Sequence, residues 1–176
     1  MGSGNGEVFG VSEASKVFAR ILAARGNAVQ PVSGDHPVDP GVLALNPTHG
    51  EAWYQVKAKS APSYLRRLAR WEHGVDVALI EEYEAIERDT GAPVWLVIHE
   101  ARSPSDPTLE SVLVKSGAYL GIRLADALLL GERRPEWPGG TGDPRNRGRD
   151  GRGGLLWPRS AMTPLAKTGE AAFRRR

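Results

Sequence analysis

Three residues of the sequence have the types and spacing that phosphate chemistry on a metal ion requires: Asp39, Gln55 and Lys57. Asp39 stands before one β-rich run, residues 42–45, and the other two lie in the next run, residues 52–60. Residues two apart on a strand share one face of a sheet. A carboxylate and an amide oxygen can hold a hard cation such as Mg2+ or Mn2+, while the ammonium faces a bound phosphate.

Each of these residues also has an ordinary structural interpretation. Asp39 precedes Pro-Gly, which is common turn chemistry, and Gln55 with Lys57 can be the solvated face of a strand. The neighbouring Trp53 and the apolar segments that follow favour a sheet covered on both faces, where an ammonium needs an anionic partner. Asp35 is also close, but only Asp39 leads directly into the apolar run.

The elements that would position these residues follow from hydrophobic periodicity. A helix begins near Ser12 and stops at Gly26, because its apolar residues recur at helical spacing between a capping serine and a glycine. We expect an α/β fold, a central mixed β-sheet of about five strands flanked by helices. The predicted strands are 28–32, 42–45, 52–60, 92–100, 111–115 and 118–124, the further helices are 75–89 and 125–130, and 64–71 is a short basic helix or loop.

Val38-Asp39, a spacer of fifteen residues and Gln55-Val56-Lys57 resemble the bipartite signature of the PD-(D/E)XK nuclease superfamily. The match is to its Asp…Gln-x-Lys variant, as seen in Mrr-like restriction endonucleases. The order of predicted elements is similar to the αβββαβ restriction-endonuclease-like core, over roughly residues 7–130. The resemblance implies a Mg2+- or Mn2+-dependent enzyme acting on DNA, with the metal held by Asp39, Gln55 and the Val56 carbonyl.

In this superfamily a glutamate on the first helix often completes the metal site, and Glu13 or Glu7 would be that residue. At 100° per residue Glu13 falls about 110° from the centre of the apolar stripe. It is therefore either solvated or leaning toward Asp39. Gln55, where the commoner motif has a glutamate, removes one negative charge and is expected to weaken metal binding.

The resemblance implies hydrolysis of DNA phosphodiester bonds, with catalytic residues Asp39, Gln55, Glu13 and Lys57. Lys57 would orient the attacking water or stabilise the added charge. Two alternatives stay open: a structure-selective Holliday-junction resolvase, which would act as a homodimer, and a catalytically inactive DNA-binding or assembly protein. Gln55 favours the inactive protein, whereas Asp39 and Lys57 oppose it. His99, at the end of a strand, is expected to be structural.

Composition narrows the class further. The chain has 176 residues, 40% hydrophobic and 25% charged, which suits one globular domain with an appendage. The absence of cysteine excludes disulfides and thiolate zinc sites. No apolar run approaches the roughly 20 residues of a membrane span, and no leader resembles a signal peptide. We therefore expect a cytoplasmic protein without a membrane partner.

The basic charge is concentrated near the C-terminus. From Gly139 onward there are nine Lys/Arg against three Asp/Glu, a net charge of +6, and the preceding residues carry −4. We expect a disordered N-terminus over 1–6, a nuclease-like domain over 7–134 and an irregular Gly/Pro/Arg-rich tail over 135–176. Apolar residues near Trp157 and Leu165 would dock part of this tail onto the domain or onto another subunit. The candidate DNA-binding residues are Lys59, Arg66, Arg67, Arg70, Arg145, Arg147, Arg149 and Arg152.

Overall fold

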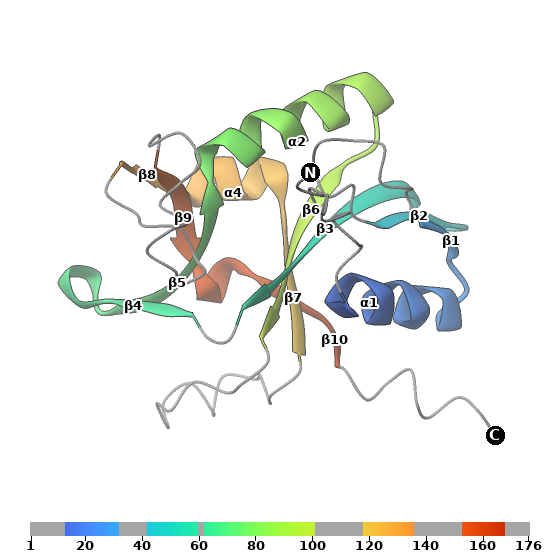
Figure 1. The fold of residues 1–176 in the computed structure, drawn as a ribbon, viewed down its shortest axis with the longest axis horizontal. Helices are drawn as coiled ribbons and strands as arrows, with labels where there is room; N and C mark the ends of the chain where they lie inside the picture. Colours follow the sequence, from blue (N-terminus) through green and yellow to red (C-terminus); the bar gives the residue numbers. More distant parts are fainter. Residues whose placement is uncertain (1–12, 32–41, 60–61, 101–117, 136–152, 168–176) are drawn as a thin grey trace, which may run out of the picture.

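The computed structural model describes residues 13–31, 42–59, 62–100, 118–135 and 153–167. Within them the chain forms two β-sheets with helices packed on the larger sheet (Figure 1). In chain order the elements are α1 (Glu13–Ala24), β1 (Ala28–Pro31), β2 (Val42–Asn46), β3 (Gly50–Lys59), β4 (Ser63–Leu65), η1 (Arg66–Leu68), β5 (Arg70–Asp76), α2 (Val77–Thr90), β6 (Val94–Glu100), β7 (Ala118–Arg123), α4 (Leu124–Leu130), β8 (Glu132–Arg134), β9 (Gly154–Pro158), η3 (Arg159–Ala161) and β10 (Thr163–Lys167).

The central sheet has six strands in the order β1-β2-β3-β6-β7-β10. Strands β3 and β6 pair in parallel, and the other neighbours pair antiparallel. The β2–β3 hairpin turns at Pro47–His49, where Asn46 Oδ1 accepts hydrogen bonds from the backbone of the turn. The predicted α/β class with a mixed sheet is confirmed, and the order α1-β1-β2-β3, then α2 and β6, is the expected αβββαβ order with β4 and β5 inserted.

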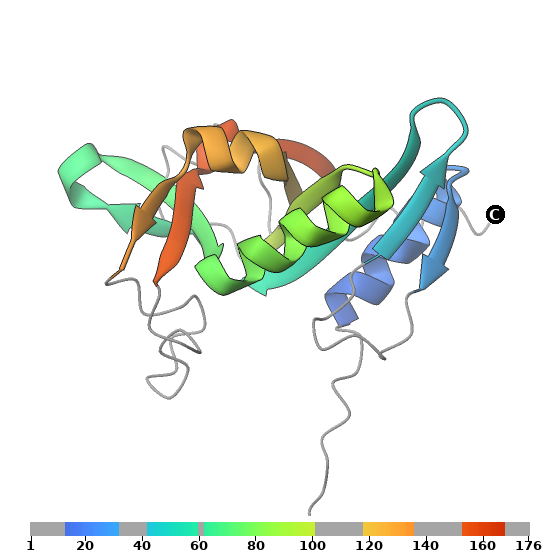
Figure 2. The ribbon, with the colours of Figure 1, turned by 90° about the horizontal axis from the view of Figure 1, so that it is seen from above.

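Both faces of the central sheet are buried, because the alternating side chains of its strands meet helices on each side. On the face covered by α1, Phe18 and Ile21 pack with Val56, Val97 and Tyr119. We call this the α1 face. The opposite face, the α2 face, packs α2 and α4 against these strand residues: Val94, Leu96, Ile98, Ala118, Leu120 and Ile122. Figure 2 shows α2 and α4 lying across that face.

The second sheet, in the order β4-β5-β9-β8, corrects the prediction for residues 64–76. Residues 64–71, expected as a short basic helix or loop, form the hairpin of β4, η1 and β5. Helix α2 therefore begins at Val77 instead of Val75, and it buries Val77, Ile80 and Tyr83. The physical reason is that β5 pairs with β9, in which Val75 lies opposite Leu155. A partner that distant in sequence leaves no local signal.

The C-terminal segment corrects the expectation of an irregular tail. Residues 153–167 contribute β9 to the second sheet and β10 to the central sheet, so this segment is part of the folded domain. The docking expected near Trp157 takes place, since that side chain is fully buried. At Gly74 of β5 a Cβ atom would come within 2.7 Å of the Leu155 carbonyl oxygen, so the β5–β9 pairing needs glycine there.

Some predictions fall outside the described residues. These are the strand over 111–115, the disorder over 1–6 and the part of the predicted irregular tail over 136–152. None of the helices that the structure describes is long and apolar enough to cross a membrane.

Replacing Trp157 by alanine tests whether the C-terminal segment belongs to the core. We expect Trp157→Ala to lower the free energy of unfolding by about 3–5 kcal/mol in urea titrations, because a fully buried indole leaves a large cavity. The control Leu129→Ala, at a residue 81% exposed on α4, should stay within about 0.5 kcal/mol of the wild type. Equal stability of all three proteins would show that residues 153–167 contribute no core packing.

Candidate functional site

Gln55 and Lys57 lie on the same face of β3, as the sequence predicts. Their side chains belong to the α2 face, in register with Leu96 and Ile98 of the parallel strand β6. β3 is an interior strand of the central sheet, between β2 and β6. Gln55 is 1% exposed and Lys57 is half-buried. The two polar side chains therefore stand among the apolar residues that α2 covers.

The buried amide of Gln55 has an unusual environment. Neither its Nε2 nor its Oε1 atom has a hydrogen-bond partner among the residues that the structure describes. Leaving a buried polar group unpaired costs about 1–3 kcal/mol, so such groups call for an explanation. A buried amide oxygen, shielded from water, is a suitable ligand for a hard cation. The residue type, its burial and its unmet hydrogen bonds thus fit the predicted role of Gln55.

The other predicted metal ligands are placed differently. Asp39 and the alternative helix residue Glu7 lie outside the described residues. The side chain of Val56 is buried on the α1 face, and the role of its carbonyl stays a prediction.

Glu13 does not join Gln55 and Lys57. It is the first residue of α1, which packs on the α1 face, whereas Gln55 and Lys57 belong to the α2 face. Its carboxylate is exposed, 3.2 Å from Arg20 Nη2 and 4.0 Å from Lys16 Nζ. Of the two possibilities that the helical projection left open, the solvated one is observed. The structure therefore corrects the assignment of Glu13 to the metal site.

A buried charged cluster that the sequence did not reveal lies at the end of β6. Glu100 is fully buried and shares the α2 face with Leu96 and Ile98 by strand alternation. Arg159 of η3 donates two hydrogen bonds to its carboxylate, from Nε at 2.7 Å and from Nη2 at 2.8 Å. His73 Nε2 of β5 lies 2.6 Å from Oε1. We call these three residues the Glu100 cluster.

The charge state of Glu100 follows from these contacts. Burial raises the pKa of Glu100, but the hydrogen bonds from Arg159 and His73 outweigh it and bring the pKa to about 2. The carboxylate is thus ionised at neutral pH. One feature of the sequence could have indicated that Glu100 is buried. It is an acid at the end of a continuous apolar strand, two residues after the core residue Ile98. His73 has no such feature, because β5 was not predicted as a strand.

His99 is structural, as expected. It lies on the α1 face, where its ring stacks on Tyr119 with centroids 4.5 Å apart. Burial lowers the pKa of His99, so the ring is neutral near neutral pH.

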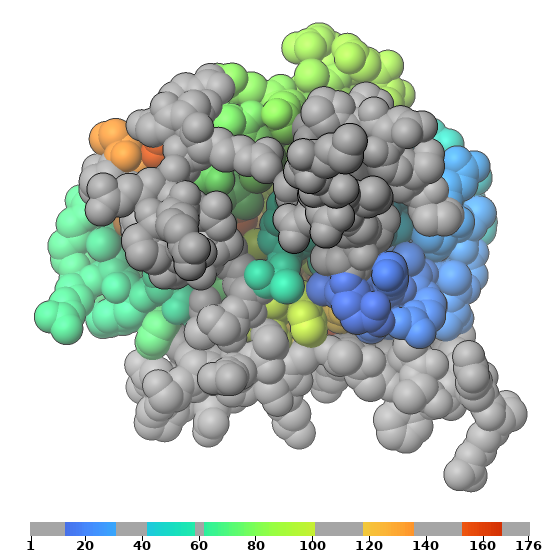
Figure 3. Space-filling view, in the orientation of Figure 1, coloured from blue at the N-terminus to red at the C-terminus, as the bar shows by residue number. Residues whose placement is uncertain are grey.

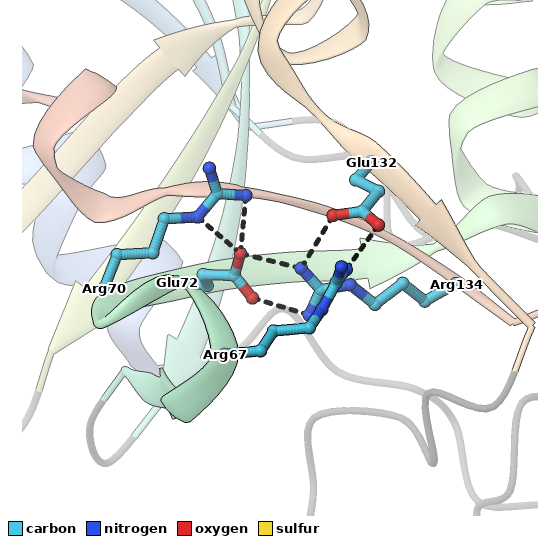
Figure 4. Close-up of polar contacts among 5 residues, drawn as sticks. All are labelled: Arg67, Arg70, Glu72, Glu132 and Arg134. Atoms are coloured by element: carbon cyan, nitrogen blue, oxygen red, sulfur yellow. Dashed lines mark hydrogen bonds and ion pairs between the residues drawn. The ribbon is translucent and has the colours of Figure 1, made fainter.

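Two of the three arginines predicted to bind DNA from residues 64–71 have partners in a second charged network (Figure 4). Arg70 Nε donates to Glu72 Oε1 at 2.8 Å, and Arg67 Nη2 donates to Glu132 Oε1 at 2.5 Å. Arg134 joins the two acids, since it binds both oxygens of Glu72 and one of Glu132. We call these five residues the Glu72 network.

The remaining DNA-binding candidates are less constrained by the structure. Arg66 is exposed and makes no ion pair with the described residues. Lys59 ends β3, two residues beyond Lys57. Arg145, Arg147, Arg149 and Arg152 lie outside the described residues.

Comparison with known proteins adds one structural similarity. The sequence matches no known protein family and no curated protein. Among solved structures, the chain is similar to that of Hjc from Archaeoglobus fulgidus, a Holliday junction resolvase from an archaeal hyperthermophile. The TM-score is 0.49 with 13% sequence identity, and the match covers 89% of this chain and 98% of that chain. At this level of similarity we base the function on the side chains themselves.

The pH dependence of stability should report the Glu100 cluster. The folded pKa of about 2 lies below the ordinary value of 4.5, so the stabilisation is present above about pH 4.5 and is lost as the pH falls toward 2. Its size is about 3 kcal/mol. Urea unfolding of the wild type and Glu100→Gln should show a difference in stability that shrinks over this range.

The control for this measurement is Glu84→Gln, at an exposed acid on α2. It should follow the wild type at every pH. A constant difference between the wild type and Glu100→Gln from pH 7 to pH 2 would contradict the assigned pKa of Glu100.

Proposed function

We propose that the chain is a metal-dependent deoxyribonuclease of the PD-(D/E)XK type, which hydrolyses phosphodiester bonds in DNA. The observation that carries the proposal is the pair on β3. Gln55 and Lys57 share one face, and the buried amide of Gln55 has no hydrogen-bond partner in the described part of the chain. A strand that only needed to fill a core would place apolar residues at these two positions, as β6 does with Leu96 and Ile98.

The order of the elements supports the same proposal. Of the residues that resemble the superfamily signature, Gln55, Val56 and Lys57 fall on β3, whose hairpin with β2 follows α1 and β1 and precedes α2 and β6. Val38 and Asp39 lie outside the described residues. The expected αβββαβ order is therefore present around the motif. The parallel pairing of β3 with β6 places Lys57 opposite Ile98, two residue pairs before the buried Glu100 at the end of β6.

The residues that would hold the metal are Asp39 and Gln55, with the Val56 carbonyl as a further oxygen ligand. Mg2+ or Mn2+ bound there supplies positive charge to a phosphate and lowers the pKa of a bound water. Lys57 faces the scissile phosphate, where its ammonium stabilises the added negative charge. With Glu13 turned to the other face, Asp39 is the carboxylate ligand of this proposal and Glu7 stays a prediction, so we expect weak metal binding.

DNA would be held by the basic residues around this strand. Lys59 continues the line of Gln55 and Lys57, and the hairpin arginines follow a few residues later. The arginines of residues 145–152 add phosphate-neutralising charge, which makes binding sensitive to salt.

A second candidate is a DNA-binding protein that has lost catalysis. Two observations favour it: Gln55 is neutral, and Glu13 pairs with Arg20 instead of completing a metal site. The two candidates differ in one measurable property, which is whether the protein cleaves the DNA that it binds.

Cleavage by site variants tests the proposed function. The wild type should cut single-stranded, linear duplex or branched DNA in the presence of Mg2+ or Mn2+. Asp39→Ala should abolish cleavage, and Lys57→Ala should lower turnover about 10²–10³-fold with metal binding largely intact. Gln55→Glu, which adds the charge of the commoner motif, should preserve activity or tighten metal binding.

Lys16→Ala, at an exposed lysine of α1, is the matched control and should cleave like the wild type. All variants should first show the wild-type melting temperature. A folded wild type that binds these DNAs but cuts none of them with either metal favours the inactive DNA-binding protein. Symmetric cutting of two strands of a four-way junction by a dimer would favour the resolvase alternative.

A further inference from the structure

The hairpin of β4, η1 and β5 exposes apolar surface at one end of the molecule. Tyr64 is 47% exposed and Leu68 is 44% exposed, and they are two of the five large hydrophobic residues exposed in the described segments. Figures 1 and 2 show this hairpin projecting beyond the other elements in both views. It forms the left-hand end of the surface in Figure 3. Exposed apolar groups gathered on a projecting element suggest a binding surface.

The aromatic part of this surface is a pair of packed rings from the two strands of the hairpin. Tyr64 of β4 lies directly opposite Trp71 of β5 in the hairpin register. Their ring centroids are 5.0 Å apart, with the planes at 55°. The pair fixes the tyrosine ring against a half-buried indole, so the ring is held in place while almost half of the side chain stays open to a partner.

The charge of the hairpin selects the class of partner. Residues 62–71 hold three arginines and no Asp or Glu. The Glu72 network contains three arginines against two glutamates, so its internal pairing leaves a net charge of +1. Arg66, which makes no ion pair with the described residues, adds another positive charge two residues after Tyr64. An exposed ring among arginines matches a nucleobase attached to a phosphate backbone.

The Glu72 network also makes the hairpin rigid. Glu72 is 1% exposed and accepts hydrogen bonds from Arg70 of the hairpin and from both terminal nitrogens of Arg134 on β8 (Figure 4). Arg67 of η1 binds Glu132 of β8. Hydrogen bonds from Arg67 and Arg134 lower the pKa of Glu132, which keeps this acid ionised. The hairpin is therefore tied to β8 at two points, although β8 is not its strand neighbour.

The position of the hairpin relates it to the candidate site. β4 begins four residues after the end of β3, the strand that carries Gln55 and Lys57. At the base of the hairpin, His73 of β5 is held by Glu100 at the end of β6. A strand of DNA bound on the hairpin would therefore be held close to the end of β3.

We propose that the β4–β5 hairpin is a base-stacking surface, in which Tyr64 and Leu68 hold unpaired nucleobases while Arg66 contacts the adjoining phosphate. This rests on the proposed action on DNA and specifies the substrate class: DNA with unpaired nucleotides, such as single strands or branch points. Bases inside a duplex are stacked on each other and cannot offer their faces to the tyrosine ring. The surface therefore discriminates between single-stranded and duplex DNA of the same sequence.

Binding measurements without divalent metal test this surface separately from cleavage. The full-length protein is titrated in EDTA with a single-stranded oligonucleotide containing 2-aminopurine and with the matching duplex. We expect Tyr64→Ala to weaken single-strand binding about tenfold, with less than a twofold effect on the duplex. Tyr64→Phe keeps the ring and should bind like the wild type. Quenching of 2-aminopurine fluorescence should be seen with tyrosine or phenylalanine at position 64 and be lost with alanine.

The matched control is Leu45→Ala, because Leu45 on β2 is 44% exposed, as is Leu68. Leu68→Ala should weaken single-strand binding and Leu45→Ala should not. Where melting shows that Tyr64→Ala is unfolded, Tyr64→Leu, which keeps apolar bulk without the ring, replaces it and should show the same loss.

Three outcomes would overturn the surface. Equal losses for single-stranded and duplex DNA would make the hairpin a phosphate contact alone. Unchanged DNA binding together with a shift from dimer to monomer in Tyr64→Ala would make it a contact between two copies of the chain. A wild-type protein that binds no DNA would contradict both the base-stacking surface and the proposed nuclease activity. Binding that follows the expected pattern without any cleavage in Mg2+ would contradict the nuclease activity alone.

Discussion

The carboxylate of Glu100 is the contact on which the arrangement of the two sheets depends. Glu100 is the last residue of β6 in the central sheet. Its carboxylate binds His73 of β5 in the second sheet and Arg159 of η3, and η3 connects β9 to β10. Removing one partner of a buried ion pair leaves an uncompensated charge and costs about 3–5 kcal/mol. Because Trp53–Lys59 of β3 pair with all of β6, the same carboxylate fixes the second sheet beside the strand that carries Gln55 and Lys57.

A second buried glutamate repeats this construction. Glu72 is held on both oxygens by Arg134, as Glu100 is held by Arg159, and each arginine comes from a part of the chain that follows its acid by about sixty residues. Two hydrogen bonds between one guanidinium and one carboxylate fix the orientation of the two groups as well as the distance between them. The hairpin that carries Tyr64 is thus bounded by two fixed carboxylates at its base, and its exposed tip can present a ring to a ligand without first ordering the chain.

Local signals in the sequence account for what could be predicted. The strands around Gln55, the apolar strand of Leu96 and Ile98 and the helix of Phe18 were predicted because their periods are read within a single element. β5 was missed because its partner β9 lies about eighty residues later. The direction of the Glu13 side chain could not be predicted. It lies on the flank of its helix, so its direction depends on how that helix packs on the sheet. Glu100 and Arg159 come together only in the folded chain, and their spacing in the sequence does not predict the ion pair.

Metal binding at Gln55 is tested most directly in a crystal of the protein soaked in Mn2+, with data collected for anomalous scattering from manganese. We expect a peak about 2–2.5 Å from the Gln55 side-chain oxygen, shared with the carboxylate of Asp39. Such a peak would give a ligand to the buried Gln55 amide, which has no hydrogen-bond partner within the described segments. A peak beside Glu13 with none beside Gln55, or no peak near β3 at a saturating Mn2+ concentration, would contradict it.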